Sequence, residues 1–321
     1  MSDKINRRDF IKKSTVVGAS SLLVSNLIPK VLNSSISNAL LTEQIDLAAV
    51  TGKNYFNNAI KAVDLLGGMK KFVYKGSKVG LLINSPWRYK GAYTNPDIVY
   101  AVIKMCYEAG AKRIIDIKGA SKRYWHRGSL AHKFEEEIKS IKSPGRKYVN
   151  VELPMARHLK EAKVKKILLD CDVFINIPII KDHGSIKCTG SLKNMMGAAA
   201  DDPTNRFMHY GYSGKNWRDN RTENYPFLSS CIADLCLVRK PDLCVCDATE
   251  VLVTNGPGGP GKLNKQQYVV ASTDWVATDS YCARFLNLKA TDILTLKTAH
   301  ELGLGEIDIT KLKIEDAKYF Y

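Results

Sequence analysis

Apolar and polar positions along the chain follow two patterns, short apolar runs and longer stretches with helical spacing. The apolar runs, which are bounded by turn residues, predict buried strands at 78–84, 112–118, 148–153, 173–180, 243–248 and 267–271. Helical spacing predicts helices within 40–76 and at 96–109, 132–141, 160–169, 228–238, 274–286 and 292–302. Strands that alternate with helices are typical of an α/β fold with a parallel-rich sheet flanked by helices.

The domain organisation follows from this alternation and from the length of the chain. The first strand–helix–strand unit predicts a parallel pair of strands joined by a right-handed crossover. Residues 40–321 are enough for a single α/β domain, which we expect to consist of two connected lobes, 40–170 and 171–321. Residues 201–226 interrupt the pattern with glycines and charges, and predict a long irregular loop that covers a site as a flap.

The segment 174–197 concentrates charged residues where a buried strand ends and a helix begins. Its apolar start leads into Lys181, Asp182 and His183, and the helix opens at 189–191. Open α/β sheets place their ligand sites at the carboxyl ends of strands and at helix N-termini. The segment therefore predicts an electropositive binding site.

Three side chains of this segment are candidates for catalysis, namely Lys181, His183 and Lys187. A histidine at a strand end can act as a general base or as a metal ligand. Neighbouring cations lower the pKa values of lysine and histidine, which suits proton abstraction or Schiff-base chemistry. The alternative is that the lysines are solvated and that the histidine bonds to the loop backbone.

Thr189, Ser191, Lys193 and Asn194 are candidates for binding an anion at the start of the predicted helix. A cation close to a helix N-terminus is unfavourable by roughly 0.3–1 kcal/mol. An anion held by the free backbone amides would reverse that sign. The position of Lys193 therefore predicts an anionic ligand.

Other candidates are more distant in the sequence. Arg206 and His209 in the predicted flap can close over the same anion, and Asn84 ends the first predicted strand. Asp247 ends another strand and Asp279 lies one turn into a helix, so the two carboxylates are candidates for holding a divalent cation or tuning a lysine. For the polar loop residues, a simple surface role is the alternative.

Several of these residues belong to short motifs spread over the chain, which are Lys181-Asp-His183, Lys187, Thr189-Gly190, Leu192-Lys193-Asn194 with Gly197, Asp247-Ala-Thr, 255–261 and Trp275-Val-Ala-Thr-Asp279. Together they resemble the domain-of-unknown-function family 362, some members of which are fused to iron–sulfur modules. The resemblance covers roughly residues 75–315. It implies an α/β fold and a short set of site positions, and it implies no particular reaction.

The N-terminus has the order of features of an export signal. Arg7 and Arg8 lie in a twin-arginine-like motif, 14–28 is a modest apolar stretch, and 37–39 offers a small-residue cleavage site. The apolar stretch is too short and too rich in serine for a stable membrane span. We therefore expect residues 1–39 to be a signal peptide read by the twin-arginine translocase, and the mature protein to be periplasmic or extracytoplasmic; a basic start with a chance arginine pair is the alternative.

Charge indicates the kind of partner. The net charge is +16, and removing 1–39, with its six basic and two acidic residues, leaves +12. Such a surface attracts anions of any kind. Because no recognition module with interleaved aromatic residues is present, we expect a small anionic ligand and no nucleic acid.

The chain has eight cysteines, none of them in a CxxC pair or a ferredoxin-like run. Most lie in apolar segments and are predicted to be small core residues. We therefore expect no iron–sulfur cluster in this chain, which departs from the iron–sulfur relatives of the family. The cofactor is otherwise unknown, with a divalent metal as a candidate.

These observations favour an exported enzyme that acts on a small anionic, carboxylate-bearing molecule. In this hypothesis Lys187 and Lys193 hold the anion, and His183 or Lys181 moves a proton. The competing hypothesis is a non-catalytic accessory protein that binds a metal or cofactor, or takes part in its maturation.

Overall fold

The computed structural model describes residues 44–211 and 221–319. Within them one mixed seven-stranded sheet runs in the order β11-β1-β10-β9-β6-β2-β3. The pairs β11–β1, β9–β6, β6–β2 and β2–β3 are parallel, and β10 is antiparallel to both of its neighbours. The strands are β1 (Leu47–Thr51), β2 (Lys78–Ile83), β3 (Arg113–Asp116), β6 (Val173–Ile177), β9 (Leu243–Leu252), β10 (Leu263–Ser272) and β11 (Ile314–Lys318). The predicted α/β class with a parallel-rich sheet is confirmed.

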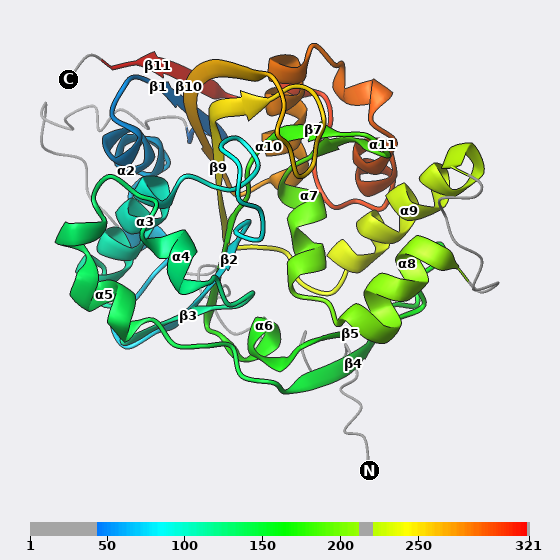
Figure 1. Ribbon diagram of the computed structural model, residues 1–321, viewed down its shortest axis with the longest axis horizontal. Helices are drawn as coiled ribbons and strands as arrows, with labels where there is room; N and C mark the ends of the chain where they lie inside the picture. The colour runs from blue at the N-terminus through cyan, green and yellow to red at the C-terminus, as the bar shows by residue number, and fades with distance from the viewer. Residues whose placement is uncertain (1–43, 212–220, 320–321) are drawn as a thin grey trace, which may run out of the picture.

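Helices cover both faces of this sheet (Figure 1). One side carries α2 (Tyr55–Leu65), α3 (Pro96–Glu108), α4 (Lys122–Trp125) and α5 (Glu135–Ser140). The other side carries α7 (Ser191–Asn194), α8 (Arg206–Tyr210), α9 (Arg221–Cys236), α10 (Trp275–Cys282) and α11 (Leu294–Glu301). Each face therefore has its own hydrophobic core.

The strand period of two distributes side chains between these cores. In β2, Val79, Leu81 and Ile83 join the core beneath α2 and α3, whereas Leu82 joins the core beneath α7 to α11. In β6, Phe174 faces the α7 side. Because both faces are buried, these central strands form nearly continuous apolar runs, which is the pattern that predicted them.

Helix α3 shows why the first strand–helix–strand unit was predictable. The Asn95 side chain accepts a hydrogen bond from the Asp97 amide, Pro96 occupies the first turn, and Gly110 follows the helix with a φ of 97°. The helix then delivers the chain to β3, which pairs parallel with β2 through Val79 and Ile114. The predicted parallel pair is confirmed.

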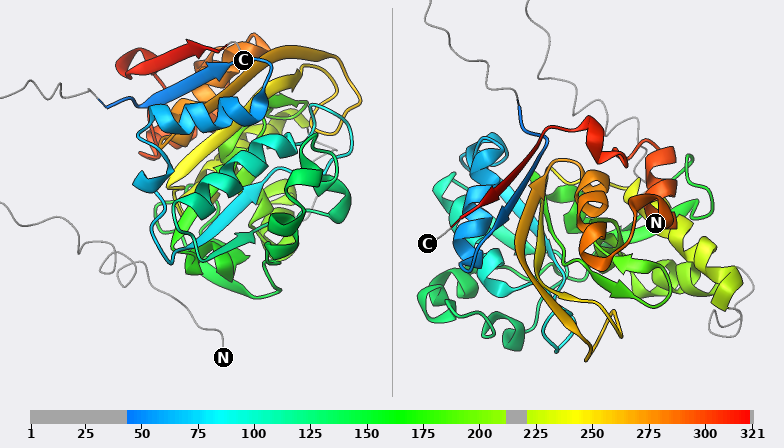
Figure 2. Two further views of the ribbon diagram at one scale, coloured as in Figure 1. Left: turned by 90° about the vertical axis from the view of Figure 1, so that its left-hand side faces the viewer. Right: turned by 90° about the horizontal axis from the view of Figure 1, so that it is seen from above.

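Two predicted segments differ from the structure. Within 40–76 only a helix was expected, yet β1 precedes α2 and lies between β10 and β11 (Figure 2). The prediction of a helix over 160–169 is wrong for its first half, because Glu161–Lys165 forms β5, which pairs with β4 (Tyr148–Glu152). Only Lys166–Asp170 is helical, as α6. In both segments the chain is extended because it pairs with a strand outside the segment.

The predicted irregular flap at 201–226 is largely helical where it is described. Asp201–Asn205 forms a π-helical turn that continues into α8, and α9 already begins at Arg221. Residues 212–220 lie outside the described residues, as does the predicted signal peptide. Before the flap, the segment expected to be a loop forms a hairpin of β7 (Lys181–His183) and β8 (Lys187–Thr189).

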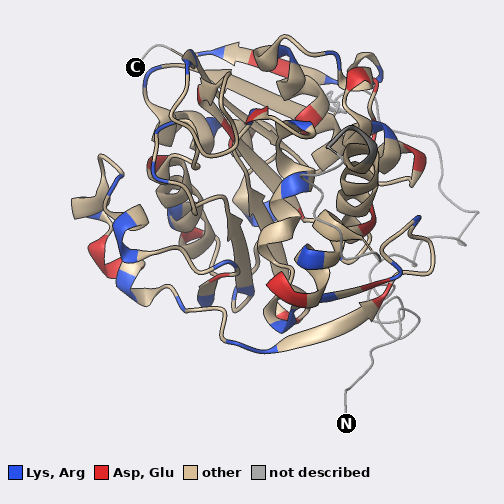
Figure 3. Cartoon of the chain, turned by 45° about the vertical axis from the view of Figure 1, so that its right-hand side comes forward, with Lys and Arg blue, Asp and Glu red and all other residues tan. Residues whose placement is uncertain are grey.

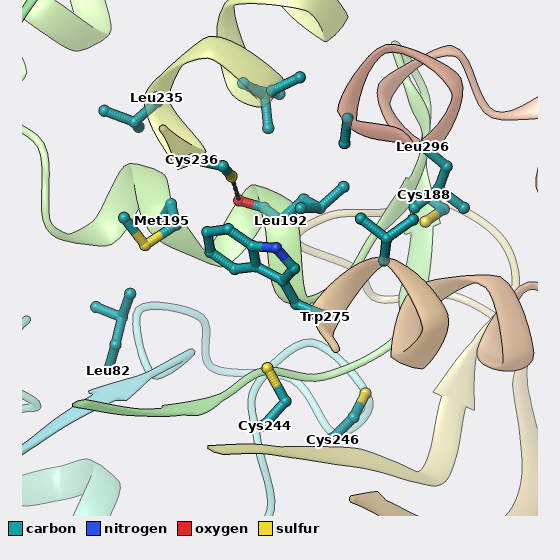
Figure 4. Packing of buried hydrophobic residues seen from close by; sticks show 14 of the residues in the cluster. Leu82, Cys188, Leu192, Met195, Leu235, Cys236, Cys244, Cys246, Trp275 and Leu296 are labelled. Carbon is teal, nitrogen blue, oxygen red and sulfur yellow. Dashed lines mark hydrogen bonds between the residues drawn. The ribbon is translucent and has the colours of Figure 1, made fainter. Parts of the chain in front are cut away.

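The short helix α7 is held in place by the core beneath it. Trp275 of α10 lies between Leu192 and Met195 on one side and Cys244 of β9 on the other (Figure 4). The Cys236 thiol donates a weak hydrogen bond of 3.5 Å to the Leu192 carbonyl. Across residues 44–211 and 221–319, no helix has the length and apolar character to cross a membrane.

Candidate functional site

A cavity of about 500 Å³ lies at the carboxyl ends of the parallel strands. Asn84 follows β2 directly, Lys118 comes two residues after β3, and Lys181 follows β6. After β2 the chain enters α3 on one face of the sheet, and after β6 it enters α7 on the opposite face. Neighbouring strands whose connections diverge in this way open a crevice, which is where α/β proteins bind ligands.

Four lysines line this cavity, and we call Lys118, Lys165, Lys181 and Lys193 the lysine cluster. They come from different elements, because Lys165 ends β5 and Lys193 lies in α7. Among the described residues, none of the four ammonium groups forms a salt bridge. Figure 3 shows basic residues in blue on the helices at the middle of the molecule as well as at its periphery.

Lys181 is the most deeply buried member of the cluster, with no exposed surface. Its Nζ donates a hydrogen bond to the Ala92 carbonyl and another, of 3.4 Å, to Asn84 Oδ1. Burial, followed by the charges of Lys193 and Lys118, lowers the pKa of Lys181 to about 6. At neutral pH its side chain is therefore mostly a free amine.

The other three lysines are partly exposed to the cavity. Burial and the charge of Lys118 lower the pKa of Lys193 to about 8. The pKa values of Lys118 and Lys165 are also lowered, mainly by burial, while Asp116 and Asp201 act in the opposite direction. Crowded cations of this kind favour a negatively charged ligand, because it relieves their mutual repulsion.

A network of three asparagines fixes the floor of the site. Asn194 Nδ2 donates to Asn176 Oδ1 at 2.7 Å and to the Leu82 carbonyl at 2.8 Å. Asn84 Nδ2 donates to Asn194 Oδ1 at 3.2 Å, and Asn176 Nδ2 donates to the Ser191 carbonyl at 2.9 Å. The predicted site residues Asn84 and Asn194 are thus brought together, and Asn84 presents its oxygen to the Lys181 amine.

The two predicted histidines lie near the lysine cluster in different settings. His183 Nδ1 accepts a hydrogen bond of 3.2 Å from the Ser185 amide, so the neutral ring carries its proton on Nε2. Burial, then Lys193, Lys181 and His209, lower the pKa of His183 to about 3. His209 lines the cavity and donates from Nδ1 to the Asn205 carbonyl at 2.7 Å. Lys181 is thus a stronger base than His183.

The helix N-terminus expected to bind the anion is already occupied. The Ser191 and Leu192 amides donate to the Asp279 carboxylate at 2.6 and 3.0 Å. The structure therefore corrects the prediction that free amides of α7 hold a ligand, since an internal carboxylate satisfies them. Thr189 still lines the cavity, whereas the Ser191 side chain is buried and does not.

Lys187 and Arg206, like His183 and Ser191, do not line the cavity. Lys187 is exposed in the β7–β8 hairpin, where its φ is 68°. Arg206 is also exposed, and its Nη1 lies 3.9 Å from Asp202 Oδ2. Of the two lysines predicted to hold the anion, Lys193 therefore lines the cavity and Lys187 does not.

The two aspartates that were candidate metal ligands both accept hydrogen bonds from groups of the protein itself. Asp247 Oδ2 accepts from the Asn95 amide at 2.7 Å, and Oδ1 accepts from the Thr249 amide and hydroxyl at 2.8 and 2.7 Å. Burial raises the pKa values of Asp247 and Asp279 to about 6. Within the described ranges no group of three or more histidine, cysteine, aspartate or glutamate side chains is arranged to hold a metal ion.

Sequence reasoning did not identify Lys118, Lys165 and Trp87, which line the cavity, or Asn176, which belongs to the asparagine network beneath it. Lys118 carried a usable signal, because it is the last residue of a predicted strand, as Asn84 is. Lys165 carried none, because its segment was expected to be helical. Asn176 lies within a buried apolar strand, where a polar side chain with no local partner indicates a hydrogen-bond network.

Comparison with known proteins shows that the sequence matches a protein family. The domain of unknown function DUF362 matches residues 78–284. A thylakoid-associated protein of Synechocystis is 25% identical over 252 residues, which cover 75% of this chain and 72% of that protein.

Solved structures give more distant matches. The lactate racemase apoprotein of Thermoanaerobacterium thermosaccharolyticum has a TM-score of 0.40 and 11% identity, with 76% of this chain and 57% of that chain covered. A Thermotoga maritima protein has a TM-score of 0.37 and 15% identity, with 78% and 60% covered. This chain therefore spans less than two thirds of either protein, and neither match bears on its chemistry. The sequence match over 78–284 is what identifies the protein as a member of the DUF362 family.

Proposed function

We propose that this chain is an exported enzyme that binds a small carboxylate-bearing anion in the lysine cluster and moves a proton with Lys181. The observation that carries the proposal is the convergence of four lysines on one cavity without a salt bridge among the described residues. Lys118, Lys165 and Lys193 outnumber the one acidic residue that lines the cavity, Asp201, and this excess of positive charge favours an anionic occupant.

The anchoring role falls to Lys193, Lys118 and Lys165. They border the cavity from three separate segments of the chain, so a carboxylate between them receives charged hydrogen bonds from several directions. Because the ammonium groups are partly desolvated, each interaction is stronger than it would be in bulk water. A dianion gains more from this arrangement than a monoanion.

The proton-transfer role falls to Lys181. Its pKa of about 6 leaves the amine free near neutral pH, and such a pKa suits a general base. The amine takes a proton from a carbon next to a carbonyl group and becomes an ammonium, and the electron pair of the broken C–H bond moves onto the carbonyl oxygen. The neighbouring cations stabilise the resulting enolate.

Deuterium exchange tests this proposal. Mature protein is incubated in D₂O with a panel of small 2-oxo and 2-hydroxy carboxylates, and loss of the α-proton or β-proton signal is followed by NMR. We expect exchange with at least one member of the panel, a loss of about 10²-fold or more in Lys181→Met, and retained binding. Lys187→Met is the matched control, because that lysine is exposed and lies outside the cavity.

Two outcomes would contradict the enzyme assignment. Equal exchange in Lys181→Met and wild type would remove Lys181 from the reaction. Binding without exchange across the panel would favour the competing class, a protein that captures a small molecule or cofactor without converting it.

A further inference from the structure

Trp87 is an exposed aromatic residue in the wall of the cavity. It lies between β2 and α3 and is 41% exposed, although an indole is usually mostly buried. Its backbone carbonyl accepts a hydrogen bond of 2.7 Å from Arg127, whose guanidinium stacks on Tyr93 at 4.4 Å from the ring centroid. The backbone of Trp87 is thus fixed although its ring remains accessible.

The ring itself is positioned by the glycine- and proline-rich segment 255–261. A Cβ on Gly258 would lie 2.8 Å from Cζ3 and 2.9 Å from Cε3 of Trp87, so only a glycine lets the backbone rest on the indole. Pro257 of the same segment also lines the cavity. This motif therefore supports an aromatic wall of the site.

The segment is in turn attached to the strand that carries Lys181. The Gly256 amide donates to Asp182 Oδ2 at 2.9 Å, and a Cβ on Gly256 would lie 1.8 Å from the Asp182 carbonyl oxygen. The Lys181 Nζ lies 5.9 Å from the centroid of the Trp87 ring. Backbone packing thus sets the indole and the amine at a fixed separation.

Tyr148 adds a second accessible ring to the same cavity. It begins β4, is 37% exposed and borders the cavity together with Trp87. The cavity thus combines cationic and aromatic walls. Carboxylates suit the first, and flat unsaturated groups suit the second, because aromatic rings stack on planar surfaces in offset geometry.

We propose that the ligand of this cavity is an anion with a planar, unsaturated body, and that Trp87 is the specificity-determining residue that stacks on this body. The inference rests on the proposed function, because it concerns the same cavity, and it adds the substrate class. The carboxylate lies among Lys193, Lys118 and Lys165, and the planar group extends toward the indole.

The test compares carboxylates of equal charge that differ in planarity. Benzoate is paired with cyclohexanecarboxylate, and phthalate with cis-cyclohexane-1,2-dicarboxylate, and their dissociation constants are measured by calorimetry on the mature protein. We expect wild type to bind each planar member about fivefold more tightly than its saturated partner. In Trp87→Leu this preference should shrink to less than about twofold while binding of the saturated member is retained.

A second variant acts on the indole without replacing it. Gly258→Ala places a methyl group against the indole, so the ring must shift. We expect this variant also to lose most of the preference for planar over saturated acids. Tyr74→Leu is the matched control, because Tyr74 is 58% exposed and does not line the cavity. Circular dichroism confirms that each variant is folded before its binding is measured.

The outcomes separate this inference from the proposed function. If wild type binds none of the four acids, the anion site and the inference are both overturned. If planar and saturated acids bind equally, the inference is overturned and the anion site stands. Retention of the full preference in both Trp87→Leu and Gly258→Ala would also overturn the role of the indole.

Discussion

The backbone amide of Ser191 donates a hydrogen bond of 2.6 Å to the carboxylate of Asp279, which lies 88 residues further along the chain. The neighbouring Leu192 amide donates to the same carboxylate at 3.0 Å. This internal anion caps α7 and fixes the turn from which Lys193 and Asn194 reach the cavity. The negative charge at this helix terminus therefore positions α7, and Lys193 lies in the same turn, two residues after Ser191.

Gly190 makes the contact between α7 and Asp279 sterically feasible. A Cβ at Gly190 would lie 2.4 Å from Asp279 Oδ1, and both groups are buried. We expect Gly190→Ala to lower the free energy of unfolding by about 1–3 kcal/mol, because overpacking forces the carboxylate from the Ser191 amide. Urea denaturation measures the change.

Gly184→Ala is the control for that prediction. Its added Cβ would meet only the Gly256 carbonyl oxygen, at 3.9 Å, and the position does not have a positive φ. Its stability should therefore stay within about 0.5 kcal/mol of wild type. An unfolding curve of Gly190→Ala that matches the Gly184→Ala curve would show that the Asp279 cap tolerates the methyl group.

Anions should stabilise the folded protein through Lys193. Sulfate, phosphate or a small dicarboxylate should raise the melting temperature of wild type, because binding to the native state adds RT ln(1 + [L]/Kd). Lys193→Ala should lose this rise and should cost little stability without ligand, because the pKa of Lys193 is already lowered to about 8. Thermal-shift titration measures the effect.

Lys187→Ala serves as the control, since it removes a lysine of the same segment that is exposed and outside the cavity. It should respond to anions as wild type does. A loss of the response in Lys187→Ala, with Lys193→Ala unaffected, would reverse the roles assigned to the two lysines.

The lowered pKa of Lys181 predicts how stability depends on pH. Between about pH 6 and pH 10.5 the unfolded chain holds a proton on Lys181 that the folded protein lacks, so the free energy of unfolding rises with pH. Relative to Lys181→Met, wild type should gain up to about 1.4 kcal/mol per pH unit across this window and change little below it. Urea unfolding at a series of pH values measures the slope. Parallel pH profiles for the two proteins would contradict a neutral buried amine.

The same pKa predicts the pH dependence of proton transfer. The free amine forms as the pH rises through about 6, so the rate of deuterium exchange should increase over that range, and it should fall again as the anion-holding Lys193 loses its proton near pH 8. A rate that falls as the pH rises through 6 would indicate that the active form of Lys181 is the ammonium.

The cysteine thiols should hardly react while the protein is folded. All eight cysteines are free and buried, and burial raises the pKa values of the Cys188, Cys236 and Cys244 thiols. Reaction with a chromogenic disulfide should therefore modify few thiols before denaturation and all eight afterwards. We also expect no iron–sulfur absorption; stoichiometric iron and sulfide in an anaerobic preparation would contradict this expectation.

Export should depend on Arg7 and Arg8, which lie outside the described residues. Replacing both with lysine keeps the charge and removes the planar guanidinium groups, so we expect the precursor to stay on the cytoplasmic side. Cell fractionation measures its distribution. Normal export of the Lys-Lys variant would contradict the twin-arginine assignment.

The local sequence pattern was sufficient to predict the helices and strands that depend on nearby residues or that are fully buried. The helical spacing of α3 and the apolar run of β6 are short-range signals, and each predicted its element. The same run predicted that Lys181 follows a buried strand, at the end where open α/β sheets place their ligand sites. Failures occurred at β1 and β5, whose extended form depends on partner strands elsewhere in the chain.

The sequence by itself therefore determined the α/β class, and it predicted that Lys181, Lys193, Asn84 and Asn194, which line the cavity, belong to one candidate site at the carboxyl ends of the strands. Only the tertiary structure brought Lys118 and Lys165 to the same cavity, turned Lys187 and Arg206 away from it, and assigned the α7 amides to Asp279. The physical reason is the separation along the chain over which each interaction acts. Capping and periodicity act over a few residues, whereas the approach of charges depends on how distant segments pack, and hydrophobic burial fixes that packing without regard to their order in the chain.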